Sequence, residues 1–73
     1  MAIVSVKTEI TGNVWKIVAT RGQRVVEDEP IMILESMKME IPVSAPEIGT
    51  VTEILTKEGD VVTEGSIVAK IEV

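Results

Sequence analysis

The chain has 73 residues, of which 45% are hydrophobic and 1% aromatic, and its net charge is −5. Without Cys or His, it offers neither disulfides nor zinc sites of the ordinary kind. The acidic balance and a single aromatic residue, Trp15, argue against nucleic-acid binding, which needs clustered basic residues and stacking rings. No apolar run exceeds four residues and no signal peptide is evident, so we expect a cytoplasmic protein with one domain, residues 1–73, and no membrane contact.

The apolar residues are those of a strand-forming chain. Val and Ile together number 22, whereas Leu occurs twice. Side chains branched at Cβ are stiff and suit a pleated surface. No segment longer than a turn places apolar residues at helical spacing, so the chain is predicted to be all-β.

In chain order, each half reads as strand, glycine-containing turn, strand, loop and strand. Pro30 cannot donate to a strand ladder, so we expect it at the start of a strand or on an edge. In the second half, residues 49–54 form a predicted strand and 57–60 a turn. Residues 66–72 form the last strand, and a period of two directs Ile67, Ala69 and Ile71 inward.

The two halves resemble each other at an offset of 37 residues. Eight of the 36 pairs at this offset are identical, where chance would give roughly two or three. The identical pairs are Val6/Val43, Gly12/Gly49, Val14/Val51, Ile17/Ile54, Gly22/Gly59, Val25/Val62, Glu27/Glu64 and Glu35/Glu72. Because glycines that mark turns also align, the repeat predicts a flattened sandwich or small barrel with pseudo-twofold symmetry. The join between the halves, near Lys38, would then lie at the end opposite the termini.

The most informative segment is Glu35-Ser36-Met37-Lys38-Met39-Glu40, at that join. It places one primary amine between two flexible apolar side chains and two acids. A lysine in water is protonated in nearly every molecule at neutral pH, and a lysine that acts as a nucleophile usually occupies a desolvated pocket. Nothing here predicts such a pocket, so Lys38 is interpreted as the substrate of another enzyme rather than a catalyst.

Two interpretations of Met37 and Met39 remain open. Methionine is flexible and polarizable, so the pair could give a partner apolar contact area, or it could fill gaps in the core. Strand alternation predicts that both methionines share one face and that Lys38 points to the other.

The segment from Glu35 to Met39 resembles the attachment motif of the biotinyl/lipoyl attachment domain family. Residues 42–51 and the Gly-Asp turn at 59–65 are similar to the corresponding parts of those domains. The resemblance covers essentially the whole chain, like that of a free-standing attachment protein. It implies a barrel-sandwich hybrid, or hammerhead, of two four-stranded antiparallel sheets with Lys38 on a hairpin turn.

The resemblance also implies a function. Lys38 would be biotinylated by a biotin protein ligase, with Met37, Met39 and Glu35 as recognition residues. The biotinyl arm would carry carboxylate between the biotin carboxylase and carboxyltransferase components of a carboxylase. The protein would then be a carrier and not an enzyme, with no catalytic residues and no metal.

Alternatives rest on particular residues. Ser36 after Glu35 is similar to lipoyl domains, which would make lipoate the cofactor and acyl or aminomethyl transfer the function. An unmodified lipoyl-like interaction domain is a third interpretation, but it leaves the Met-Lys-Met triplet unexplained. The three adjacent acids at 27–29 could bind a metal, but such a run is more often a solvated turn.

Overall fold

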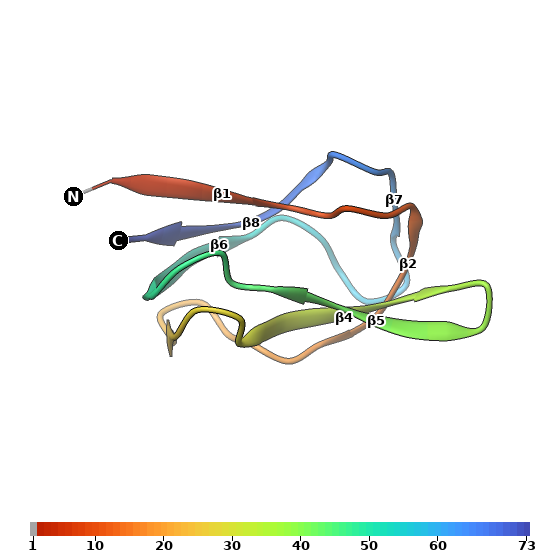
Figure 1. Ribbon diagram of the computed structural model, residues 1–73, viewed down its shortest axis with the longest axis horizontal. Coiled ribbons are helices and arrows are strands. Elements are labelled where there is room, and N and C mark those ends of the chain that lie inside the picture. Colours follow the sequence, from red (N-terminus) through yellow and green to blue (C-terminus); the bar gives the residue numbers. More distant parts are fainter. Residues whose placement is uncertain (1) are drawn as a thin grey trace.

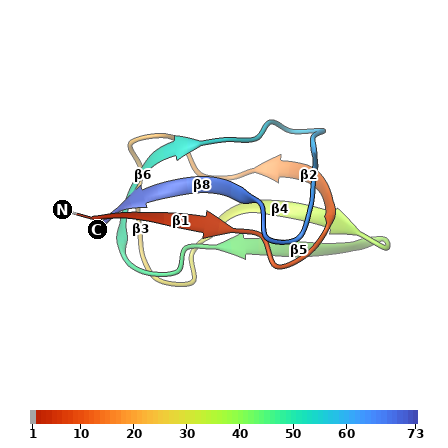
Figure 2. The same ribbon diagram turned by 90° about the horizontal axis from the view of Figure 1, so that it is seen from above.

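A computed structural model describes residues 2–73 and shows eight β-strands. Figures 1 and 2 show no helix among them, which confirms the all-β prediction. The strands are β1 (Ile3–Lys7), β2 (Gly12–Ile17), β3 (Arg24–Val25), β4 (Pro30–Ser36), β5 (Met39–Ser44), β6 (Gly49–Ile54), β7 (Val61–Val62) and β8 (Ile67–Glu72). Pro30 is the first residue of β4, as its missing N–H requires. Over the same residues, no helix is present that could cross a membrane.

The strands form two four-stranded antiparallel sheets, as predicted. One sheet has the order β1-β8-β6-β3 and the other β5-β4-β2-β7. A shift of 37 residues converts β1–β4 into β5–β8, and it also converts one sheet order into the other. Each half therefore contributes strands to both sheets, and the core forms only when the two halves interlock.

Hydrogen bonds between the halves come in equivalent pairs. The Gly22 N–H donates to the Val51 carbonyl at 2.6 Å, and the Gly59 N–H donates to the Val14 carbonyl at 2.7 Å. Both glycines have positive φ, 90° and 96°, in turns that side chains rarely tolerate. These pairs confirm that the glycine repeat marks a pseudo-twofold axis.

Gly12 and Gly49 are required for a different reason, because each lies against a backbone carbonyl. A Cβ on Gly12 would lie 2.7 Å from the Glu35 carbonyl oxygen, and a Cβ on Gly49 would lie 2.5 Å from the Glu72 oxygen. Only glycine permits this approach. The pair therefore fixes β2 against β4 and β6 against β8.

The core lies between the sheets and consists mainly of Val, Ile and Ala side chains. Its members are Val6, Val14, Ala19, Val25, Ile31, Met32, Leu34, Val43, Ala45, Val51, Val62, Val68, Ala69 and Ile71. The inward prediction is right for Ala69 and Ile71 and wrong for Ile67, which is 41% exposed. The β1–β8 register shifts between Val6 and Lys7, so Val68 takes the buried position and the period of two is interrupted.

The molecule is elongated, measuring 37 × 18 × 18 Å. Figures 1 and 2 both place the chain ends at one end of the long axis and the β4–β5 hairpin at the other. Backbone hydrogen bonds in both directions join Ala2 and Val73. The predicted separation of Lys38 from the termini is therefore confirmed.

Candidate functional site

Lys38 lies on a two-residue turn that joins β4 to β5. Ser36 pairs with Met39 at the end of the hairpin, which leaves Met37 and Lys38 as the central turn residues. Their φ angles are 52° and 65°. Two consecutive positive φ angles are the feature of a type I′ turn, which matches the twist of the flanking strands and normally selects Asn-Gly.

Met and Lys are poor residues for this turn. Each Cβ crowds the backbone in the left-handed region, at a cost of about 1–2 kcal/mol per residue. The strained turn therefore lowers the stability of the protein. It places Lys38 beyond the last paired residues of β4 and β5. Strain of this kind is concentrated at functional sites, which makes the turn the candidate site.

The two methionines next to Lys38 are exposed. Met37 is 91% exposed and Met39 is 59% exposed, whereas Met32 is fully buried. Neither methionine therefore fills a gap in the core, and the contact with a partner stays a prediction. Strand alternation does not apply to Met37 and Lys38, because both belong to the turn and the strand begins only at Met39.

Two carboxylates face each other across the hairpin. Glu35 pairs with Glu40 one step before the turn, and both side chains are exposed. Like charges directly opposite each other on a sheet are destabilising. The hairpin therefore carries an acidic pair beside the lysine, a second feature that does not serve the stability of the fold.

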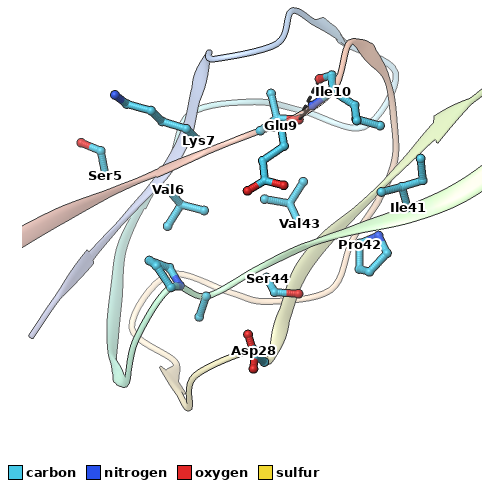
Figure 3. A pocket seen from close by; sticks show the side chains of 13 residues that line it. Ser5, Val6, Lys7, Glu9, Ile10, Asp28, Ile41, Pro42, Val43 and Ser44 are labelled. Atoms are coloured by element: carbon cyan, nitrogen blue, oxygen red, sulfur yellow. Dashed lines mark hydrogen bonds between the residues drawn. The ribbon is translucent and has the colours of Figure 1, made fainter.

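A groove of about 360 Å³ lies between β1 and β5, away from the turn. Figure 3 shows Val6 and Val43 on facing strands, with the Glu9 carboxylate pointing into the groove. Its two walls, residues 5–9 and 42–46, are related by the 37-residue repeat. Lys38 is not among the residues that line it, so the lysine is presented outward and not held in this groove.

The acidic run at 27–29 forms a turn. One Glu29 carboxylate oxygen accepts from the Val26 N–H at 3.0 Å, and the other accepts from Gln23 Nε2 at 3.3 Å. Asp28 has a φ of 70°, equivalent to Gly65 with 86° in the other half. Residues 2–73 contain no group of three His, Cys, Asp or Glu side chains that could hold a metal.

The sequence did not reveal two parts of the site. One is the positive φ of Met37 and Lys38, because neither residue signals a type I′ turn. The other is the role of Gly12, whose lack of a side chain lets β2 approach Glu35 of the hairpin. The alignment of Gly12 with Gly49 is the signal from which that role could have been found.

Fold and site together define a small β-module that presents Lys38 on an exposed turn at one end. A family model described as "Biotin-requiring enzyme" matches residues 1–71. The chain belongs to this family.

Its relatives include small proteins and segments of large ones. The "Biotin/lipoyl attachment protein" of Bacillus subtilis is 40% identical over 68 residues, 93% of each chain. The "Biotinylated protein TB7.3 homolog" of Mycobacterium leprae is 38% identical over 66 residues, 90% of this chain and 93% of the relative. The crystal structure of Kluyveromyces lactis urea carboxylase matches with a TM-score of 0.93 at 39% identity, over 99% of this chain and 6% of that one.

Proposed function

We propose that Lys38 is a biotin attachment site and that the protein is a carrier in carboxyl transfer. The observation that carries this proposal is the strained turn, which places Lys38 at the tip of the molecule between two exposed methionines. A prosthetic group bound through an amide needs a primary amine that another active site can enclose. Lys38 fits this requirement, because its side chain is exposed and it lies on the turn of the β4–β5 hairpin, which Figure 1 shows at the end opposite the termini.

Attachment would proceed in the active site of a biotin protein ligase. The Lys38 Nζ attacks the acyl carbon of biotinyl-adenylate, an amide bond forms, and AMP leaves. The amine must first lose a proton. The ligase supplies the base that accepts it, because this chain contains no His or Cys side chain to do so. Met37 and Met39 provide adaptable apolar contacts around the amine, and Glu35 provides charge.

Biotin, when attached, would carry a carboxyl group. The module's own residues contribute position: the turn holds the attachment point clear of both sheets, so that it can enter a biotin carboxylase and then a carboxyltransferase. Because the attached group stays tethered, it meets the second active site locally and does not have to diffuse to it. The match to a segment of a urea carboxylase supports carboxylase components as partners. On this proposal the chain itself is a substrate and carrier, not a catalyst.

The test is coexpression with a biotin protein ligase and, separately, a lipoate ligase, followed by intact mass and peptide mapping. We expect a single biotin increment on Lys38 and none on the Lys38→Arg variant, whose melting temperature should match that of the wild type. A lipoyl increment alone would assign the chain to acyl or aminomethyl transfer. An unmodified Lys38 with both ligases would contradict the proposal.

A further inference from the structure

The outer faces of the two sheets differ although the repeat makes them equivalent. On the outer face of the β5-β4-β2-β7 sheet, strand pairing gathers Trp15, Ile33, Pro42 and Val61, with Lys16 opposite Ile33 and Asn13 opposite Val61. A shift of 37 residues places Thr52, Lys70, Ser5 and Arg24 at the equivalent positions of the other sheet. The sheet that carries the hairpin therefore has four apolar residues on its outer face, here called the apolar face, at positions where the other sheet has polar ones.

Trp15 is the centre of this apolar face. The β2–β4 register shifts between Val14 and Lys16, so Trp15 occupies a bulge opposite Ile33. Trp15 is 50% exposed, and Val61 is 70% exposed. At the equivalent bulge of the other sheet, the Thr52 hydroxyl donates to the Lys70 carbonyl at 3.2 Å. A threonine thus satisfies the same backbone geometry, so the fold does not require tryptophan at position 15.

The apolar face is continuous with the hairpin that carries Lys38. Ile33 pairs with Pro42, and Glu35 pairs with Glu40 two residues nearer the turn, on the same face of β4 and β5. The acidic pair therefore borders the apolar face on the side of the lysine. A complementary partner would offer an apolar surface with basic side chains beside it, and its active site would lie just past them.

We propose that Trp15, Ile33 and Pro42, with the Glu35–Glu40 pair, form a docking face for the biotin protein ligase. This inference rests on the proposed function. The ligase must bind the hairpin before any biotin is attached, so its affinity has to come from the protein surface around Lys38. A carboxylase can in addition bind the attached group, and it therefore depends less on such a face. A tryptophan that a partner buries on binding is among the residues that most often dominate the binding energy of a protein interface.

The experiment exchanges residues between equivalent positions. Trp15→Thr installs the residue of the polar face, and Thr52→Trp is the matched control on the other sheet. Biotinylation kinetics are measured with a ligase for which the wild type is a substrate, and thermal unfolding by circular dichroism verifies the fold. We expect Trp15→Thr to raise KM for the protein about tenfold with kcat within about twofold, and Thr52→Trp to leave both unchanged.

A second measurement separates docking from chemistry. The Lys38→Arg variant cannot be biotinylated, so it should inhibit biotinylation of the wild type competitively. Adding Trp15→Thr to this variant should raise the inhibition constant by the same factor as KM. Replacing Glu35 and Glu40 by Gln should flatten the salt dependence of KM.

Each outcome has a defined meaning. A wild type that is not biotinylated would overturn the proposed function, and the docking face with it. Efficient biotinylation with unchanged KM and inhibition constant for Trp15→Thr would overturn the docking face alone. The same result with slower carboxylation of the biotinylated variant would assign the face to a carboxylase and contradict the proposal.

Discussion

The two ends of the molecule are built from equivalent strand pairs, β4–β5 at one end and β8–β1 at the other. At the hairpin end, Ser36 pairs with Met39 and a strained turn connects them. At the other end, the equivalent residues Val73 and Ala2 are joined by hydrogen bonds. The frame is shared, whereas the strained turn and the acidic pair occur at one end. The paired glycines serve the fold in both halves, whereas the strained turn and the acidic pair do not stabilise it and mark the candidate site.

The largest expected effect concerns the equivalent glycines. Gly12→Ala and Gly49→Ala should each lower the free energy of unfolding by about 3 kcal/mol, because each new Cβ meets a backbone carbonyl. Urea denaturation measures this loss. Only Gly12→Ala should also slow biotinylation of the folded protein, because the carbonyl it displaces belongs to Glu35 of the hairpin. Equal biotinylation rates for the two variants would show that Gly12 does not position the site.

A smaller effect is expected from relaxing the turn. Replacing Met37 by Asn and Lys38 by Gly gives the turn its preferred residues and should raise the free energy of unfolding by about 1 kcal/mol. Chemical denaturation at equilibrium provides the measurement, and Lys38→Arg is the control that removes the amine but keeps the strain. If the variant is no more stable than this control, the turn is not strained by its residues.

The smallest effect concerns the acidic pair. At the equivalent position of the other end, Glu72 pairs with Ile3 instead of a second acid. Glu40→Ile should therefore raise the free energy of unfolding by about 0.5 kcal/mol, because it removes a like-charge pair. The gain should shrink at high salt, where the repulsion is already screened. A gain that is independent of salt would assign the effect to packing instead.

Much of the fold follows from the sequence because it is encoded twice. The 37-residue repeat predicted the pseudo-twofold frame, and Gly12, Gly49 and Pro30 have the structural roles that their types require. The position of Lys38 opposite the termini followed from the same repeat. Duplicated glycines are informative because each reports a backbone constraint that no other residue meets.

Bulges and turn geometry did not follow from the sequence. The irregularity in β1–β8 pairing moved Ile67 outward, and its cause is a register shift that no residue type signals. Met37 and Lys38 form a turn that their own propensities oppose, so local preference predicted strand alternation there. The roles of Met37, Met39 and Glu35 in ligase recognition stay predictions until kinetics test them.

The hydrogen bonds between Ala2 and Val73 have a mechanical consequence. They hold both chain ends at the end of the molecule opposite Lys38, so a chain that continued from either terminus would turn the module about that point. Half a rotation would carry the lysine through about twice the 37 Å long axis. The rigid module would then act as a lever, and a short flexible segment at its base would be enough to move the amine between distant active sites.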